Sequence, residues 1–324
     1  MFRFFSRRPP LLLFFFILRL PVPGYGDDQE AEPLRFAAIP EDPRPGEPVT
    51  LAYAGPDRPG LRAVLLNARG QRLSRVLFFN LPGEQDEIPL KTAILTIPST
   101  IQPGPALVQI EDGNGNRVAE LPLTVGSREF ISEEIVLDQR NTDIRTQQDP
   151  QKTAESAALS AILFRTGTDI FTAGPFIPPV SSTRRTSFFG DRRVFRYVDG
   201  SRDTSIHGGI DYGVPRGTPV AACASGRVVL ARFRILTGYS VVIEHLPGTY
   251  SLYYHLDKIL VEEGTLVEGG TQIGESGATG LATGPHLHWE IRVAGENTDP
   301  DACVARPILD KAVILSKING NHGF

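Results

Sequence analysis

The sequence predicts a mostly β protein in which two β-rich regions are joined by a helical connector. Short apolar runs alternate with turn residues in both outer regions, and the chain is rich in turn formers, with 32 Gly and 27 Pro. An alanine-rich stretch in the middle has the pattern of one helix. At 324 residues, 41% hydrophobic and 22% charged, the chain is long enough for about two globular domains.

Residues 1–26 have the pattern of a secretory signal peptide. Three arginines fall in the first eight residues and precede an apolar run, Leu11–Leu18. That run is shorter than the roughly 20 apolar residues of a spanning helix, so we expect cleavage before Asp27 and no stable membrane span afterwards. An uncleaved anchor is the alternative. The expected location is therefore outside the cytoplasm, in the periplasm or cell envelope.

The charge balance argues against nucleic acid as a partner. The whole chain has a formal net charge of -4. Residues 1–26 contain four arginines and no acidic residue, so the remainder has 29 basic and 37 acidic groups, a net charge of -8. A nucleic-acid-binding domain normally presents a basic surface, and this composition gives no sign of one.

Residues 27–126 predict a β-sandwich of immunoglobulin type. Apolar runs such as 49–53, 63–66 and 107–110 are separated by turn residues about every dozen positions. Asp112–Asn116, with its glycines and asparagines, is a strong hairpin signal because these residues tolerate positive φ. The region contains no histidine and no cluster of catalytic residue types. We interpret it as a spacer or binding module.

Residues 127–179 predict a connector with one helix. Asp149 is a good N-cap, Pro150 suits the first helical position, and an alanine-rich run continues to Arg165 before Gly167. A proline-rich stretch then breaks the structure before the second domain. One hypothesis is that a polar side chain from this connector lies over a groove of the second domain and keeps it latent.

Residues 180–304 predict a second β-rich domain, followed by a C-terminal tail at 305–324. The V-x-x-G rhythm of Val261–Gly274 is typical of barrel-sandwich folds, including biotin and lipoate carriers. A carrier needs a modified lysine after that rhythm, whereas Lys258 precedes it, so the carrier interpretation fails. The chain has two cysteines, Cys223 and Cys303, which either form one disulfide or pack as buried thiols.

The segment from His286 to Ile291 predicts a strand that carries chemistry. In an extended chain, His286, His288 and Glu290 fall on one face. The alternate positions are apolar and fall on the other face, at Leu287, Trp289 and Ile291. Two imidazoles on one face can hold zinc. Two half-exposed histidines on an ordinary surface strand are the alternative that an H-x-H pair by itself leaves open.

Five of the six histidines lie between His207 and His288, which favours a single site. His207 and Asp211 are four residues apart and share a face of an extended segment. The glycine midway between them, Gly209, leaves room there for a metal ion in this interpretation. His207, Asp211 and one histidine of the H-x-H pair would make the three protein ligands of a catalytic zinc site. Spacing leaves open which of the pair binds, or whether both do.

These motifs together resemble the lysostaphin-type zinc metallopeptidases, also called the LytM family, which cut peptide cross-links in bacterial cell walls. The resemblance covers about residues 180–301. It rests on HGGIDYG at 207–213, YYHLD at 253–257 and TGPHLHWE at 283–290. TSFFGDR at 186–192, which is similar to the family's S-x-F-G-x-R, and GTPV at 217–220 support it.

The resemblance implies one Zn²⁺ per chain, with these ligands: His207, Asp211 and His288. It also implies that His286 and His255 are unligated catalytic histidines. His245 and His322 are interpreted as non-catalytic. Trp289 stands where phenylalanine is more usual, and Ser240 where glycine is common, so the shape of the groove differs from the family pattern.

The expected function is that of an exported zinc metalloendopeptidase, a hydrolase that acts on peptidoglycan. Zinc-activated water would attack the scissile amide with a histidine as general base. The alternative is a catalytically silent protein that binds the cell wall and activates an amidase. Silent relatives have usually lost residues of the metal site, whereas this chain keeps all five. A structural zinc protein would need a fourth protein ligand, and none is evident.

Overall fold

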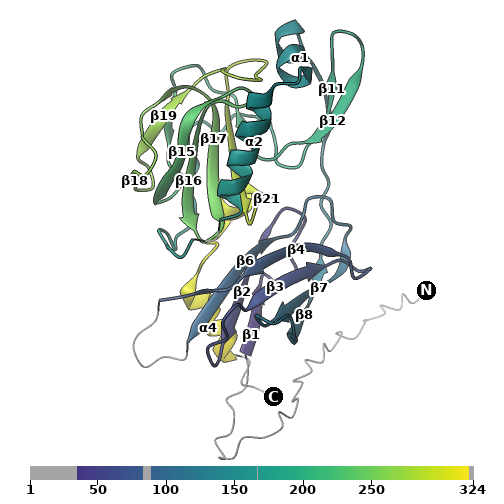
Figure 1. Ribbon diagram of the computed structural model, residues 1–324, viewed down its shortest axis with the longest axis vertical. Helices are drawn as coiled ribbons and strands as arrows, with labels where there is room; N and C mark the ends of the chain where they lie inside the picture. The colour runs from purple at the N-terminus through teal and green to yellow at the C-terminus, as the bar shows by residue number, and fades with distance from the viewer. Residues whose placement is uncertain (1–34, 83–88, 166, 321–324) are drawn as a thin grey trace, which may run out of the picture. The chain divides into compact units, whose positions relative to one another are not determined.

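A computed structural model describes residues 35–82, 89–165 and 167–320 of the chain (Figure 1). The signal peptide expected at 1–26 and His322 lie outside these ranges. Within them, no helix combines the length and the apolar character that a membrane span requires. The described chain is mostly β, as the sequence predicts.

Two four-stranded antiparallel sheets form the first region. The strand orders are β1-β2-β6-β5 and β4-β3-β7-β8. Their bounds are β1 Arg35–Ile39, β2 Pro48–Ala54, β3 Arg62–Leu66, β4 Arg72–Leu77, β5 Phe79–Asn80, β6 Leu90–Thr96, β7 Gly104–Glu111 and β8 Arg117–Val125. Leu51 and Leu95 from one sheet and Leu65 and Ile110 from the other are fully buried in one core. The immunoglobulin type of this sandwich stays a prediction.

The connector contains one strand and two helices, where the sequence predicted one helix. Its elements are β9 (Ser132–Val136), α1 (Gln139–Thr146) and α2 (Pro150–Leu163). Helix α2 begins where expected, with the Asp149 side chain accepting from the Gln151 amide at 2.7 Å. Helix α1 was missed because it is polar all round and has no apolar periodicity.

The second region is built on a ten-stranded sheet with the main order β10-β13-β20-β17-β16-β15-β18. Its strands are β10 Arg185–Ser187, β13 Ile210–Tyr212, β14 Pro219–Ala221, β15 Gly226–Arg234, β16 Gly238–Leu246, β17 Thr249–Ile259, β18 Leu266–Val267, β19 Gln272–Ser276, β20 Leu287–Val293 and β21 Glu296–Thr298. A separate three-stranded sheet joins the hairpin of β11 (Arg192–Arg196) and β12 (Arg202–Ile206) to β9, which runs parallel to β11. The connector therefore supplies a strand beside the hairpin that leads into His207.

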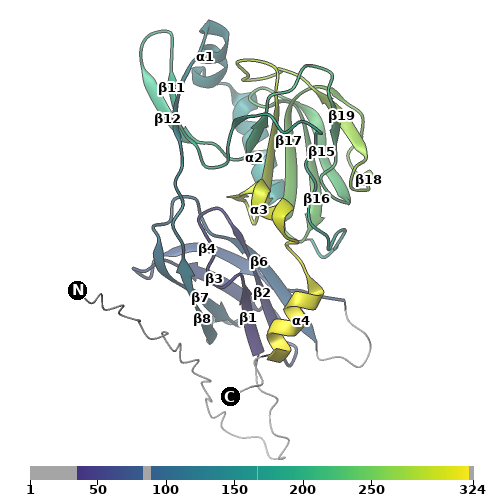
Figure 2. The same ribbon diagram turned by 180° about the vertical axis from the view of Figure 1, so that it is seen from behind.

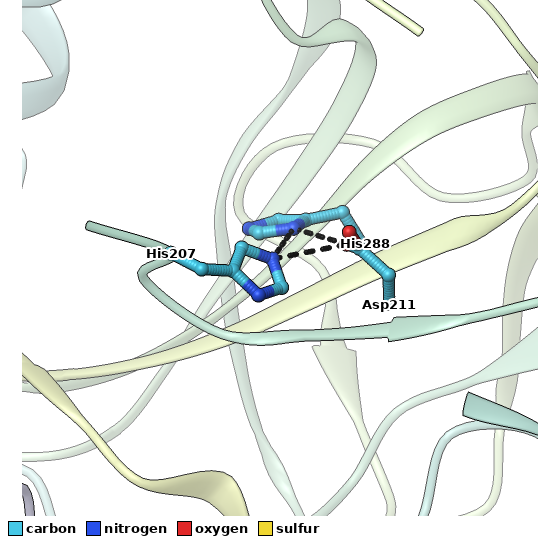
Figure 3. Close-up of side chains that lie close together, drawn as sticks. All are labelled: His207, Asp211 and His288. Atoms are coloured by element: carbon cyan, nitrogen blue, oxygen red, sulfur yellow. Dashed lines mark hydrogen bonds and ion pairs between the residues drawn. The ribbon is translucent and has the colours of Figure 1, made fainter. Parts of the chain in front are cut away.

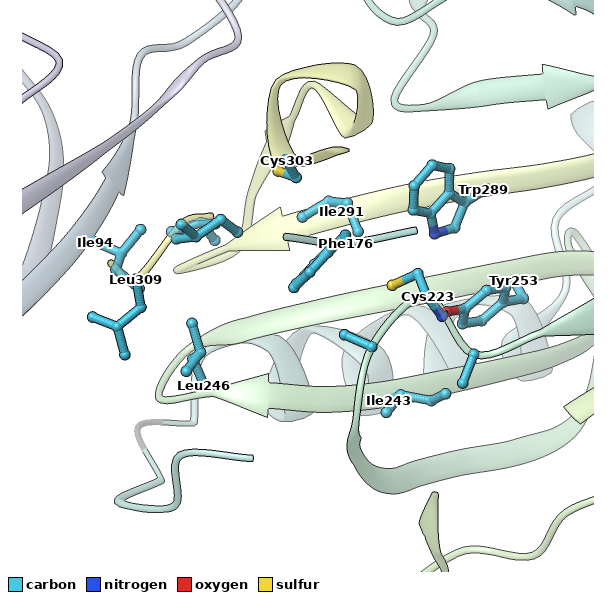
Figure 4. Close-up of a cluster of buried hydrophobic side chains, with 14 of the residues drawn as sticks. Ile94, Phe176, Cys223, Ile243, Leu246, Tyr253, Trp289, Ile291, Cys303 and Leu309 are labelled. Carbon is cyan, nitrogen blue, oxygen red and sulfur yellow. The ribbon is translucent and has the colours of Figure 1, made fainter. Parts of the chain in front are cut away.

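Both faces of the large sheet are buried. On one face, α2 packs through Ile162 and Leu163 against Val242 and Leu252, and Figure 1 shows α2 lying along β16 and β17. The other face carries the largest apolar cluster, part of which is drawn in Figure 4 around Trp289. Because neither face is open to water over its central strands, polar side chains placed there need partners within the protein.

The two cysteines are free thiols and both are buried. Cys303 belongs to α3 (Pro300–Ala305). The tail expected at 305–324 contains a further helix, α4 (Lys311–Gly320), which contacts β1 and β2 (Figure 2). Lys317 of α4 pairs with Glu41 at 2.8 Å. Strands β14 and β19 pair with each other, and β19 also pairs with the end of β17.

Candidate metal centre and active site

Strand register brings the candidate ligands together. In the antiparallel pairing of β13 with β20, Asp211 lies opposite His288, and β17 places Tyr254 on the other side of His288. The Tyr254 ring stacks on the His288 ring, with 5.5 Å between centroids and 3° between planes. The alternate residue of β20, Trp289, is fully buried on the opposite face. The predicted division of this strand into a histidine face and an apolar face is confirmed.

His207, Asp211 and His288 form one cluster (Figure 3). His207 Nε2 lies 3.1 Å from Asp211 Oδ1 and 3.0 Å from His288 Nδ1, and His288 Nδ1 lies 2.6 Å from Asp211 Oδ1. The three residues are 2%, 6% and 7% exposed. These values rule out half-exposed histidines on an ordinary surface strand.

The hydrogen bonds outside the cluster determine which ring nitrogens carry the hydrogens. His207 Nδ1 lies 2.7 Å from the Phe188 carbonyl, and His288 Nε2 lies 2.9 Å from Glu290 Oε1. Both outer partners can only accept, so in the neutral rings these nitrogens carry the hydrogens. The inner nitrogens and the Asp211 carboxylate are then three acceptors that face one another. A bound cation satisfies three such lone pairs, and two imidazoles with one carboxylate suit zinc.

The same geometry attracts a proton to the cluster. Burial opposes a charge on His288, yet Asp211 and Glu290 on either side raise its pKa to about 9. Burial likewise opposes ionisation of Asp211, but the two histidines hold its pKa well below the ordinary value. A cation and a proton would therefore compete for the same place.

The glycines of the HGGID motif make room for a neighbouring strand. A Cβ on Gly209 would lie 2.1 Å from the Trp289 carbonyl oxygen and 2.9 Å from Glu290 Cγ. A Cβ on Gly208 would lie 2.3 Å from Asn297 Nδ2 and 2.9 Å from Glu290 Oε1. The interpretation that Gly209 leaves room for a metal ion is wrong, because β20 and the Glu290 side chain occupy that space.

His255 and His286 lie beside the cluster with their ring centroids 4.7 Å apart. His255 Nδ1 lies 2.8 Å from the Thr279 carbonyl, and His286 Nδ1 lies 2.8 Å from the Gly284 carbonyl. In each neutral ring, Nδ1 donates and Nε2 keeps its lone pair. Burial is the main cause that lowers both pKa values, that of His255 to about 3, and nearby histidines add to the effect.

The backbone at His255 marks a change of partner along β17. Residues up to Tyr254 pair with β20, whereas residues from Leu256 onward pair with β19. His255 itself has φ of 60°, a left-handed conformation that is uncommon for residues with a side chain. Its amide donates to the Thr237 carbonyl at 2.8 Å. Such strain concentrates at functional sites, and here it turns the His255 ring toward His286.

Comparison with known proteins identifies the domain that holds this cluster. Residues 205–300 match Peptidase family M23, and that segment contains all five candidate residues. The chain carries a peptidase family M23 domain. This confirms the family resemblance that the sequence motifs indicated.

Two curated relatives and one solved structure extend the match. The DD-carboxypeptidase/endopeptidase Mpg of Neisseria meningitidis is 40% identical over 124 residues, covering 38% of this chain and 28% of the relative. The peptidoglycan DD-endopeptidase ShyA of Vibrio cholerae is 43% identical over 117 residues, covering 36% and 27%. A putative peptidase M23 from Pseudomonas aeruginosa is 25% identical with a TM-score of 0.56, over 81% of this chain and 94% of that one. The matched segment thus covers less than a third of the length of each of these two curated relatives.

Arg193 and Glu133 support the metal cluster, and no motif in the sequence marks them. Arg193 Nη2 donates to Asp211 Oδ2 at 2.6 Å, which leaves Oδ1 facing the histidines. Arg193 Nε also donates to Glu133 Oε1 at 2.7 Å, and Glu133 belongs to the connector strand β9. No spacing in the sequence signals these pairs, because Arg193 and Asp211 belong to separate sheets, and Arg193 meets Glu133 only through the parallel pairing of β11 with β9.

Helix α1 contacts two segments beside the candidate site. Arg140 Nη2 donates to the Gly280 carbonyl at 3.2 Å, in the loop that holds His255. Arg145 Nε donates to the Tyr197 hydroxyl at 2.9 Å, on the β11–β12 hairpin that leads into the metal cluster. The connector thus contacts both sides of the site, while the hypothesis that it keeps the enzyme latent stays a prediction.

Proposed function

We propose that this chain is an exported, zinc-dependent endopeptidase that hydrolyses peptide cross-links of bacterial peptidoglycan. One observation carries the proposal, namely that two imidazole nitrogens and a carboxylate oxygen converge as acceptors within 3.1 Å of one another. The M23 match and the names of the curated relatives support peptidoglycan as the substrate. The N-terminal arginines and apolar run support export.

The proposed zinc ligands are His207 Nε2, Asp211 Oδ1 and His288 Nδ1. Bound Zn²⁺ would supply a Lewis acid that polarises the scissile carbonyl and makes water a better nucleophile at neutral pH. Arg193 keeps the second oxygen of Asp211 occupied, so that one carboxylate oxygen remains for the ion. With three protein ligands, the site leaves a coordination position open, which distinguishes catalytic from structural zinc.

His286 and His255 are the proposed catalytic histidines. Each donates its Nδ1 hydrogen to a backbone carbonyl, so its Nε2 lone pair is available for a proton. His286 Nε2 lies 3.9 Å from Asp211 Oδ1, so it is close enough to serve a nucleophile at the metal cluster. We assign His286 as the general base. His255, whose ring lies beside that of His286, is the second histidine that would contact the reacting group.

The most direct experiment uses the full chain and intact peptidoglycan, with and without a chelator. We expect soluble peptide fragments from the zinc-loaded protein and none after chelation. Because the curated relatives are named as DD-endopeptidases, the D-alanyl link to a diamino acid is the first bond to seek in the fragments. Zinc-loaded protein that binds the wall but releases nothing would favour the alternative, a silent protein that activates an amidase.

A paired substitution separates ligand from base. We expect Asp211→Ala to lose both zinc and hydrolysis, because the carboxylate is one of three ligands. His286→Ala should retain zinc and lose roughly 10² to 10⁴-fold in turnover, the usual contribution of a general base. Zinc content by atomic absorption and fragment release measure the two effects. Equal metal loss in both variants would overturn the assignment within the H-x-H pair.

A further inference from the structure

Glu290 is a buried carboxylate that the proposed mechanism does not use. It lies two residues after His288 on the same face of β20 and is 7% exposed. Its Oε1 lies 2.9 Å from His288 Nε2. A buried carboxylate in contact with a ligand candidate needs a physical explanation, because taking its charge out of water is costly without compensating partners.

The contact with Glu290 determines which nitrogen of His288 carries the hydrogen. A neutral imidazole has one donor nitrogen and one acceptor nitrogen. An ionised carboxylate can only accept, so the hydrogen resides on Nε2 and the lone pair on Nδ1. Nδ1 is the atom that lies 2.6 Å from Asp211 Oδ1 and 3.0 Å from His207 Nε2. The opposite tautomer would set two lone pairs against each other at Glu290 and a hydrogen toward the ion.

Two further residues hold Glu290 in place. Arg292 Nε donates to Oε2 at 2.8 Å, and Asn297 Nδ2 lies 3.3 Å from the same oxygen. Arg292 and Asn297 are opposite each other in the β20–β21 pairing. Asn297 Nδ2 also donates to the Gly208 carbonyl at 2.8 Å, between the two ligands of the HGGID motif. One polar network therefore connects the β20–β21 hairpin to both ends of the metal cluster.

The network also accounts for the adjacent glycines. As the distances to Glu290 and Asn297 show, a side chain on Gly208 would collide with both residues. The close approach of the HGGID backbone to this network thus requires glycine. The space that the glycines provide serves the support of His288, which is an arrangement expected for a second layer around a metal site.

We propose that Glu290 is a positioning residue that fixes His288 as the tautomer with Nδ1 free for zinc, and that Arg292 and Asn297 fix Glu290. The inference rests on the proposed zinc site and adds to it a residue that touches neither substrate nor metal. Outer partners of this kind typically change metal affinity by about 10- to 100-fold.

The test compares Glu290→Ala and Glu290→Gln with Glu244→Gln in the full chain. Glu244 is also a buried glutamate of the large sheet, 8% exposed, and lies outside the site, so it is a matched control. Zinc affinity is measured by competition with a chromogenic chelator. Long-range ¹H–¹⁵N spectra of the zinc-loaded proteins report which nitrogen of His288 carries hydrogen.

We expect Glu290→Ala to weaken zinc binding roughly 10- to 100-fold and to mix the His288 tautomers. Glu290→Gln should lose less, because its amide oxygen can still accept the Nε2 hydrogen. Glu244→Gln should match the wild type. Asn297→Ala, which leaves Glu290 itself in place, should give a loss of a few-fold and keeps the test valid if the alanine variant at 290 fails to fold.

The outcomes distinguish this inference from the proposed function. If wild-type protein takes up zinc and cleaves peptidoglycan while the variants at 290 and 297 bind zinc as tightly with an unchanged His288 tautomer, the inference alone is wrong. If the wild-type protein takes up no zinc, the proposed function and the inference fall together. A loss of zinc affinity in Glu244→Gln equal to that in Glu290→Gln would also overturn the inference, because it would show a general effect of buried charge.

Discussion

The metal cluster and a single buried histidine, His245, lie on opposite faces of the same sheet, and they differ in how their hydrogen bonds are matched. On one face, His245 has Nδ1 2.8 Å from the Ser225 carbonyl and Nε2 2.7 Å from Ser251 Oγ, so its donor and its acceptor each have a partner. On the other, His207 and His288 direct acceptors at each other and at Asp211. Buried histidine is common to both faces, and only the unmatched acceptors indicate a metal site.

His245 and His288 also respond oppositely to protons. Burial lowers the pKa of His245 to about 4, although its bond to the Ser225 carbonyl acts in the other direction. Burial acts on His288 in the same sense, but two carboxylates reverse it and raise its pKa to about 9. The difference comes from the neighbouring charges, because both rings are buried.

The largest expected effect tests the contrast directly, with the same substitution at His288 and at His245. We expect His288→Gln to reduce zinc from about one ion per chain to background and to abolish hydrolysis, because a three-ligand site loses one ligand. The His245→Gln variant should still bind about one zinc ion per chain at the metal cluster. Metal analysis after dialysis against zinc measures both. If His245→Gln lost the metal as well, the distinction between the matched histidine and the unmatched metal cluster would be broken.

Acid stability is the next effect. An ordinary histidine titrates near pH 6.5, so between about pH 6.5 and 4 the unfolded chain binds more protons at His245 than the folded protein does. The contribution of His245 to stability is therefore complete above pH 6.5 and is lost as the pH falls toward 4. The difference between the two pKa values corresponds to about 3 kcal/mol.

Denaturant unfolding at a series of pH values measures this contribution. The free energy of unfolding of the wild type should fall more steeply than that of His245→Gln from pH 6.5 to 4. Parallel curves for the two proteins would contradict the interpretation of His245 as a neutral, fully matched core residue.

A smaller effect is expected at Arg193, which sharpens the account of the metal cluster. Arg193→Gln removes the charged donor from Asp211 Oδ2 and leaves the side chain of Asp211 freer to rotate. We expect zinc affinity to fall by about tenfold, as is typical when a residue that supports a ligand is lost. Chelator competition measures it. Arg227→Gln, which removes a more exposed arginine paired with Asp169, is the control and should change nothing.

The smallest effect concerns access of small molecules to the metal cluster. Arg145→Ala removes the bonds from α1 to Tyr197 and Asp203 on the β11–β12 hairpin. We expect a chelator to strip zinc a few-fold faster from this variant in stopped-flow measurements, because α1 contacts both sides of that site. Labelling of the buried Cys223, whose pKa burial raises to about 11, should stay as slow as in the wild type. Equal acceleration of both reactions would indicate general loosening.

Local pattern alone determined much of the site. The two-residue period of a strand assigned His286, His288 and Glu290 to one face and Trp289 to the other, and this follows from backbone geometry. The helix start at Asp149 was likewise predictable, because an N-cap acts on amides two or three residues away. Motif spacing was enough to indicate the family.

Only the tertiary structure decided how the pieces meet. The register that sets Asp211 opposite His288, the partner change at His255 and the approach of Arg193 to Asp211 all join segments distant in the chain. Glu290 was visible on the correct face, yet its role depends on which ring nitrogen it contacts. Period and spacing describe neighbours along one strand, whereas hydrogen-bond matching depends on every element packed around the side chain.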